Sequence, residues 1–186
     1  MEPSMIRTDT RVRLFVAVPI PALIQKNLIA ALNSFPQYIE QTIDQERWHL
    51  TLVFLGEVEN PRQYWSRLTK ALPQAFMPTI SITHIGRGLQ RDQLWAYAHP
   101  TAILFNLYRE LGQRLRGMRF PLPRQQYDDF VPHVHVANLY PMARGIGIAD
   151  AAVTTTFSVR ELLVYRSVPG AHGSQYATEA AIPLGA

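Results

Sequence analysis

The sequence contains no cysteine among its 186 residues. Disulfide bonds, thiolate metal sites and a cysteine nucleophile are therefore excluded, and a reducing, cytoplasmic location is the expectation. A long apolar run is also missing. Residues 14–23 are apolar, but the run is short and is broken by Pro19 and Pro21. It predicts a β-strand rather than a secretory leader, and we expect no membrane span and no membrane partner.

Lysine is scarce, because Lys26 and Lys70 stand against 16 arginines. The formal charge is +4 and the sequence pI is about 9.6. Arginine makes planar, bidentate contacts with phosphate oxygens, so this composition is compatible with a nucleic acid or a phosphorylated substrate. Genome base composition can produce the same bias, and the charges are scattered along the chain. Charge alone therefore does not decide the function.

Length and hydrophobic content predict either one compact domain or two small fused lobes, since 47% of the residues are hydrophobic. We expect residues 1–10 to form a flexible tail. Apolar periodicity and turn residues predict strands at residues 11–18, 48–54, 79–85, 93–98, 130–139, 156–165 and 175–182, and helices at residues 21–35, 61–72 and 101–117. Strands and helices do not alternate strictly, which favours an α+β fold with mostly antiparallel pairing.

Two predicted strands carry polar side chains on a face that alternation would otherwise make apolar. The first is RWHLTLVFLG (residues 47–56), with His49 and Thr51, and the second is FVPHVHVANL (residues 130–139), with His133 and His135. Residues two apart on a strand share a face. His49 and His133 lie 84 positions apart, so we interpret the pattern as an internal duplication in which each half contributes one histidine to a shared cleft.

A pair of imidazoles suits the cleavage of a phosphodiester. One neutral histidine can take a proton from water or a hydroxyl, while the other, protonated, gives a proton to the departing oxygen; both states coexist near the unperturbed pKa of about 6.5. A hydroxyl two residues beyond the histidine can donate a hydrogen bond to a non-bridging phosphate oxygen. This chemistry requires neither a metal nor another cofactor.

The chain resembles the two-histidine phosphoesterase superfamily and, within it, the RNA 2′,3′-cyclic phosphodiesterases, also called 2′-5′ RNA ligases. That family carries two His-x-Thr-x tetrads, and the first is intact at residues 49–52. The resemblance also includes RLFVAVP (residues 13–19), HLTLxFLG (residues 49–56) and the closing pattern of Ser167, Gly173 and Tyr176, and so extends over most of the chain.

The resemblance implies a single domain over residues 1–186, built from two similar lobes. Each lobe would be a mostly antiparallel sheet with helices on its outer side, and a pseudo-two-fold axis would relate the lobes around a central groove. It also implies hydrolysis of a 2′,3′-cyclic phosphate to a 2′-phosphomonoester, with a reverse 2′-5′ ligation. His49 would be the proton donor and His133 the proton acceptor, with Thr51 and His135 binding the phosphate. RNA ends or small cyclic nucleotides would be the substrates of a monomeric enzyme.

The second tetrad departs from the family pattern, because His135 stands where threonine or serine is usual. A protonated or suitably tautomeric His135 can still donate an N–H to phosphate. Asn138 occupies a position where many relatives have arginine, and Arg144 or another arginine could replace that contact. Phe15, Trp48, Trp95 and Tyr176 could stack on a base, although core packing is the default for each.

Two alternatives remain open at this level. His133 and His135 on one strand face could hold zinc or another divalent ion, with His49 as a third ligand. The chain could also be a non-catalytic nucleotide- or RNA-binding module that has kept the fold and lost turnover.

Overall fold

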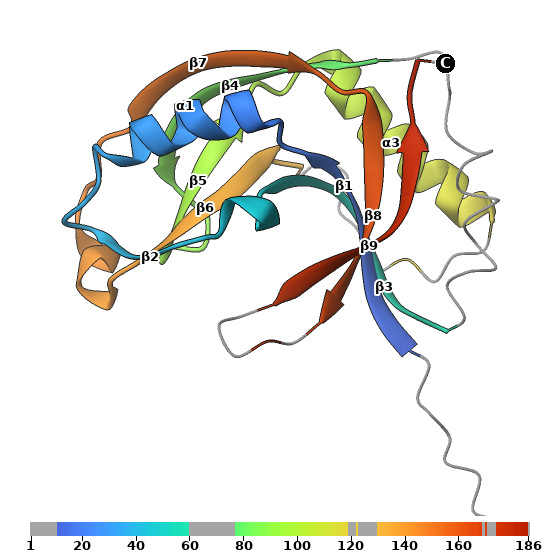
Figure 1. The fold of residues 1–186 in the computed structure, drawn as a ribbon, viewed down its shortest axis with the longest axis horizontal. Helices are drawn as coiled ribbons and strands as arrows, with labels where there is room; N and C mark the ends of the chain where they lie inside the picture. The colour runs from blue at the N-terminus through green and yellow to red at the C-terminus, as the bar shows by residue number, and fades with distance from the viewer. Residues whose placement is uncertain are drawn as a thin grey trace, which may run out of the picture.

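The computed structural model describes residues 11–59, 77–118, 122, 130–168, 170 and 174–185, which form one nine-stranded sheet with two α-helices (Figure 1). The strands are β1 (Arg11–Pro19), β2 (Ile39–Thr42), β3 (His49–Glu59), β4 (Thr79–Arg87), β5 (Gln93–Ala98), β6 (His133–Leu139), β7 (Ala151–Ser158), β8 (Glu161–Val168) and β9 (Gln175–Pro183). The helices are α1 (Ala22–Leu32) and α3 (Ala102–Gly117), with 3₁₀ turns η1 (Gln45–Arg47) and η3 (Pro141–Gly145).

Every strand pair is antiparallel, and the sheet order is β7-β4-β5-β6-β3-β1-β8-β9, with β2 pairing against β6. The strands that carry the two histidine motifs, β3 and β6, are neighbours at the centre. We call β3, β1, β8 and β9 the first half of the sheet, and β6, β5, β4 and β7 the second half. The predicted α+β, mostly antiparallel fold is confirmed, while the duplication and its pseudo-two-fold axis stay predictions.

The two helices are amphipathic and pack on the core side of the sheet. α1 buries Ile24, Leu28 and Leu32, spaced four residues apart, and lies along β7 and β4 of the second half (Figure 1). α3 packs against β3 of the first half. It begins at Thr101, whose side-chain oxygen accepts a hydrogen bond from the Leu104 backbone N–H at 3.2 Å. Such a cap stabilises a helix by about 1 kcal/mol.

The predicted boundaries are mostly close to those observed, but one prediction is wrong. Residues 156–165 were expected to form a single strand, whereas β7 ends at Ser158 and β8 begins at Glu161. Val159 is buried between them, and no glycine or proline marks the turn. β2 was not predicted, because most of its short stretch is exposed and lacks alternation. The predicted helix at residues 61–72 and the tail at residues 1–10 lie outside the described residues.

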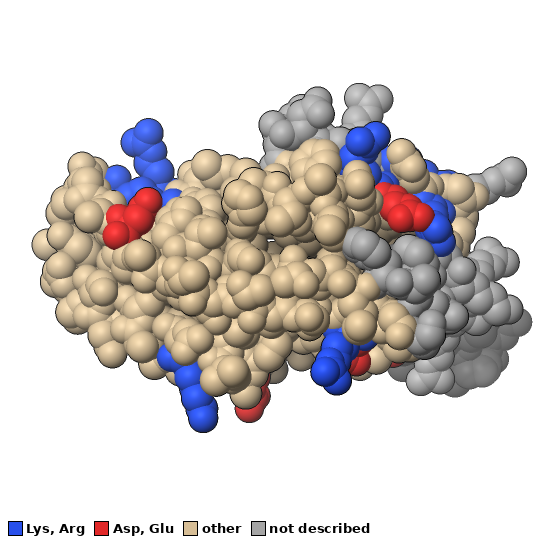
Figure 2. Space-filling model, turned by 90° about the horizontal axis from the view of Figure 1, so that it is seen from above, with Lys and Arg blue, Asp and Glu red and all other residues tan. Residues whose placement is uncertain are grey.

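The charged surface agrees with the scattered pattern in the sequence. On the face seen in Figure 2, lysine and arginine lie near the edges, some of them beside acidic residues, and uncharged residues fill the middle. Among the residues coloured there, no broad basic track is present. The described helices include none with the length and apolar character needed to cross a bilayer.

Candidate active site

The two histidine motifs meet at one pair of residues. Leu50 of β3 pairs with Val134 of β6, and both side chains are fully buried in the main core. Because side chains alternate along a strand, the residues on either side of this pair point to the opposite face. Extending the antiparallel register by one position places Thr51 across from His133, and His49 across from His135. The pairing thus brings together all four predicted site residues.

His49 and His133 are oriented by the same type of hydrogen bond. The Nδ1 atom of His49 donates to the Arg47 carbonyl at 2.7 Å, and that of His133 donates to the Val131 carbonyl at 2.7 Å. A carbonyl can only accept, so Nδ1 carries the hydrogen in both rings. Each neutral imidazole therefore keeps Nε2 as its basic nitrogen, ready to accept a proton or, once protonated, to return it.

These rings border a small cavity of about 60 Å³, which is lined by Ile43, Arg47, His49, Thr51, His133, His135 and Tyr176. One water-sized group needs about 10–15 Å³, so the cavity has room for about four to six such groups, similar to a phosphoryl group. None of the described residues that line it is acidic. A guanidinium and three imidazoles without a carboxylate make the cavity suitable for an anion.

Burial disfavours the charged form of all three imidazoles. Burial, partly offset by the hydrogen bond to Arg47, lowers the pKa of His49 from 6.5 to about 4, and the nearby charges of His133, His135 and Arg47 contribute further. Burial also lowers the pKa of His133 and of His135. A bound anion would favour protonation of these rings, so that anion binding and proton uptake would be coupled.

Aromatic rings support the two catalytic candidates in different ways. His49 lies among Phe15, Tyr165 and Tyr176, with ring centroids at 4.8, 5.7 and 5.0 Å. His133 instead stacks on Trp95, with centroids 3.5 Å apart and planes 11° apart. Phe15, Tyr176 and Trp95 therefore contact the imidazoles directly.

Trp48, the fourth aromatic residue considered from the sequence, is buried in the main core. Its burial agrees with the default interpretation as a packing residue, and Trp48 also lines the larger groove beside this cavity.

His135 differs from the hydroxyl that it replaces. Its Nε2 atom hydrogen-bonds the Ala137 carbonyl at 3.2 Å and the Asn138 side-chain oxygen at 2.9 Å, so Nε2 is the donor. Neutral His135 consequently has no second N–H, and it can donate to a phosphate only when Nδ1 is also protonated. Asn138 therefore orients the His135 ring through this hydrogen bond. It does not supply the positive charge that an arginine at this position would bring.

Arg47 is the arginine that the sequence did not single out. It precedes His49 on η1, lines the cavity, and places its guanidinium carbon 5.8 Å from the centroid of the Tyr176 ring. Its charge lowers the pKa values of His49 and His135. Arg144, the replacement named from the sequence, instead pairs with Asp92 at 3.3 Å and does not line the cavity.

The described residues do not fit the metal alternative well. Among them, no group of three histidine, cysteine, aspartate or glutamate side chains is arranged to hold an ion. The Nε2 atom of His135 is also engaged by two oxygens. The set of His49, His133 and His135 therefore lacks the geometry that three ligands of one ion need.

Solved structures share this fold. The Escherichia coli LigT complexed with NADP⁺ matches with a TM-score of 0.74 and 22% identity, over 95% of this chain and 99% of that one. LigT complexed with 3′-AMP matches with a TM-score of 0.73 and 22% identity, over 94% and 98%. TT0787 of Thermus thermophilus matches with a TM-score of 0.76 and 20% identity, over 93% and 98%. The chain thus has a LigT-like fold.

Two curated relatives are named after a specific activity. The chain is 26% identical to the RNA 2′,3′-cyclic phosphodiesterase of Geobacillus stearothermophilus, over 91% of this chain and 56% of that protein. It is 23% identical to the RNA 2′,3′-cyclic phosphodiesterase of Thermotoga maritima, over 69% and 72%. The chain thus spans little more than half of the first relative. No protein-family model matches. The predicted resemblance to the RNA 2′,3′-cyclic phosphodiesterases, also called 2′-5′ RNA ligases, is confirmed.

Proposed function

We propose that this protein is a metal-independent RNA 2′,3′-cyclic phosphodiesterase that opens the cyclic phosphate to a 2′-phosphomonoester. The observation that carries the proposal is the pair of imidazoles, His49 and His133, which border one phosphoryl-sized cavity and each keep Nε2 for proton transfer. The names of the curated relatives support the same reaction.

In the proposed mechanism, His133 takes a proton from water as the water oxygen attacks phosphorus. The bond from phosphorus to the 3′ oxygen breaks, and His49 gives its proton to that oxygen, leaving the phosphate on the 2′ oxygen. A 5′-hydroxyl that attacks in place of water yields a 2′-5′ phosphodiester, which is the ligation. Thr51, Arg47 and protonated His135 hold the non-bridging oxygens and offset the charge that develops there.

The lowered pKa of His49 bears on its role as proton donor. With a pKa of about 4, His49 is neutral near pH 7. A donor must be protonated, so the negative charge of the substrate has to raise this pKa when it binds. The same low pKa would also suit a proton acceptor. The assignment of donor to His49 and acceptor to His133 is therefore part of the proposal.

The decisive assay incubates purified protein with nucleoside 2′,3′-cyclic phosphates in the presence of EDTA and identifies the product isomer by phosphorus NMR. We expect turnover to the 2′-phosphate, unaffected by the chelator. Activity that EDTA abolishes and zinc restores would establish the metal alternative instead. We further propose that residues 1–186 act as one two-lobed, monomeric unit in the cytoplasm on RNA ends or small cyclic nucleotides.

One observation favours the second candidate, a nucleotide-binding module without turnover. The hydroxyl expected at position 135 is replaced by a ring whose N–H is already engaged by Ala137 and Asn138. A phosphate would therefore lose one donor near neutral pH. Tight binding of a 2′-phosphorylated nucleotide by well-folded protein, with no hydrolysis of the cyclic form over long incubation, would support this function.

A further inference from the structure

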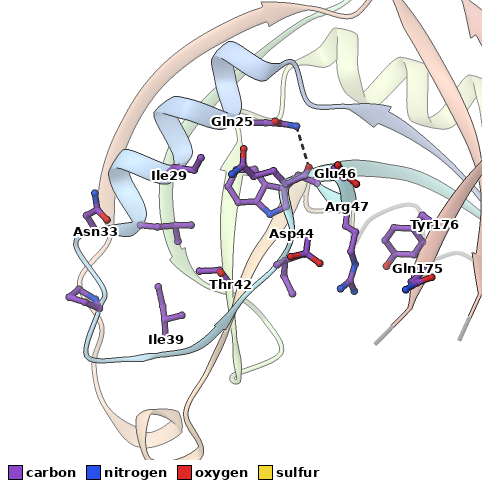
Figure 3. Close-up of a pocket in the computed structure, with 15 residues that line it drawn as sticks. Gln25, Ile29, Asn33, Ile39, Thr42, Asp44, Glu46, Arg47, Gln175 and Tyr176 are labelled. Atoms are coloured by element: carbon purple, nitrogen blue, oxygen red, sulfur yellow. Dashed lines mark hydrogen bonds between the residues drawn. The ribbon is translucent and has the colours of Figure 1, made fainter. Parts of the chain in front are cut away.

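A groove of about 1130 Å³ lies beside the catalytic cavity (Figure 3). Its walls come from α1, β2, η1 and the start of β9. Ile43, Arg47 and Tyr176 line both the groove and the cavity, so the two spaces share a border. At this border the guanidinium of Arg47 lies near the Tyr176 ring, as Figure 3 shows.

Hydrogen bonds from Gln25 connect two walls of the groove. The side-chain nitrogen of Gln25 on α1 donates to the Ile20 carbonyl at 3.0 Å and to the Gln45 carbonyl of η1 at 3.2 Å. The second of these bonds is the dashed line in Figure 3 and joins the helix wall to the η1 wall. This bond fixes the two walls relative to each other, and small-molecule sites are usually largely pre-formed in this way.

Size decides which part of a substrate the groove can take. The catalytic cavity, at about 60 Å³, accommodates little more than the phosphoryl group. Sites for larger ligands have volumes of about 300–1,000 Å³, and the groove, at about 1130 Å³, is slightly larger than that range. The sugar and base of a cyclic nucleotide are covalently attached to the phosphate, so they must extend from the cavity into an adjoining space. The groove is such a space.

The lining chemistry suits a nucleoside better than additional phosphates. Ile29, Leu32, Pro36 and Ile39 provide apolar contact area, while Asn33, Asp44 and Glu46 provide hydrogen-bonding groups. Arg47 is the only basic residue among the described residues of the lining, and it stands at the border with the cavity. Two carboxylates would repel a phosphate backbone but can accept hydrogen bonds from base or ribose donors.

We propose that the groove between α1 and β2 binds the nucleoside portion of the substrate while the attached phosphate occupies the catalytic cavity. This inference rests on the proposed function for the identity of the reacting group. It adds the site at which the base and sugar are held, and it assigns that site to residues outside both tetrads.

Equilibrium binding tests the inference without requiring turnover. Thr42 lines the groove from β2, is exposed, and does not line the cavity, so Thr42→Trp should fill the groove. Ile29→Trp does the same from α1. The matched control is Ile103→Trp, on an exposed position of α3 away from the groove lining. The probes are adenosine 2′-monophosphate and inorganic phosphate, measured by isothermal titration calorimetry.

We expect both groove variants to weaken binding of the nucleotide by roughly tenfold or more, since lost pocket contacts commonly have effects of this size. Their affinity for inorganic phosphate should stay within about twofold of wild type, and the Ile103→Trp control should match wild type for both probes. Unchanged nucleotide affinity in both folded groove variants would overturn the inference. Failure of the proposed function has a separate signature, which is nucleotide binding without hydrolysis of any nucleoside 2′,3′-cyclic phosphate.

Discussion

Trp95 and His133 stack face to face, with ring centroids 3.5 Å apart and planes 11° apart. The indole is itself held, because its N–H donates to the Gln93 side chain at 2.7 Å and its surroundings include Gly88. A Cβ atom added at Gly88 would lie 2.6 Å from the indole ring. The absence of a side chain at position 88 thus lets Trp95 take the place that supports His133.

Loss of the stacking between Trp95 and His133 should lower the turnover rate. We expect Trp95→Leu to lower kcat by roughly tenfold, because His133 would keep its hydrogen bond to Val131 but lose the flat surface that limits its rotation. Trp95→Phe retains a ring and should lose less. Gly88→Ala should resemble Trp95→Leu, since the indole must move. Steady-state kinetics on a nucleoside 2′,3′-cyclic phosphate provide the measurement, and wild-type kcat in Trp95→Leu would contradict the expected role.

Removal of either imidazole to which we assign proton transfer should abolish most of the activity. We expect His49→Ala and His133→Ala to fold normally and to lower the rate by about two to four orders of magnitude, the range typical of general acid–base catalysis. His99→Ala is the matched control, because His99 is exposed and does not line the cavity. Rates comparable with wild type in either site variant, with the fold checked by circular dichroism, would reject the mechanism.

Arg47 should contribute mainly to substrate binding. We expect Arg47→Ala to raise KM by roughly tenfold or more, since a hydrogen-bonded positive charge near the phosphate would be lost. The pKa of His49 should rise at the same time, because the Arg47 charge lowers it. Arg144→Ala serves as the control, since Arg144 pairs with Asp92 away from the cavity. Equal KM values for the two variants would remove Arg47 from the site.

His135→Thr restores the hydroxyl of the family pattern. Wild-type His135 donates to a phosphate only when protonated, and burial lowers its pKa, so phosphate binding by wild type should weaken as the pH rises. A threonine hydroxyl donates at every pH used. We expect the variant to remain active and to show a KM that depends less on pH. A completely inactive but folded variant would mean that His135 has a separate, indispensable role.

Protein stability should fall on mild acidification. The folded-state pKa of His49, about 4, lies below the ordinary 6.5, and those of His133 and His135 are shifted in the same direction. Between the folded-state pKa of about 4 and the ordinary value of 6.5, the unfolded chain binds more protons at His49 than the folded chain does. The free energy of unfolding therefore decreases as the pH drops below about 6.5. Urea titrations of wild type and His49→Gln, at about pH 7.5 and pH 5, measure this effect. The variant should lose less stability, and an equal loss in both would show that His49 does not titrate in this way.

Much of the site could be predicted from local sequence. His49 and His133 each interrupt an apolar alternation, and strand period alone places Thr51 and His135 beside them on one face. Two equivalent interruptions also suggested that the strands come together, which the Leu50 to Val134 pairing shows.

The other residues around the cavity could not be predicted from the sequence. Their positions depend on strand pairing between distant segments, on local turns that lack a sequence signal, or on side-chain rotamers. Trp95 reaches His133 because β5 pairs with β6, and Tyr176 reaches His49 from β9, 127 residues further along the chain. Arg47 enters the cavity because η1 turns the chain just before β3, and no glycine or proline marks that turn. The engagement of His135 by Asn138 likewise depends on side-chain rotamers, which residue spacing does not determine.

The order of the strands has a consequence for any attempt to divide this protein. The second half of the sheet comes from one continuous segment of the polypeptide chain, from β4 to β7. The first half combines β1 and β3, which precede that segment, with β8 and β9, which follow it. α1, which precedes the His49 strand, packs on β7 and β4, and α3, which precedes the His133 strand, packs on β3. A polypeptide truncated after β3 would leave β1 without its partner β8 and α1 without a surface to cover. We therefore expect that neither the fragment ending after β3 nor the remaining C-terminal fragment folds alone. We also expect that a protein cut by a protease between the two histidine motifs stays active only while its two pieces remain associated.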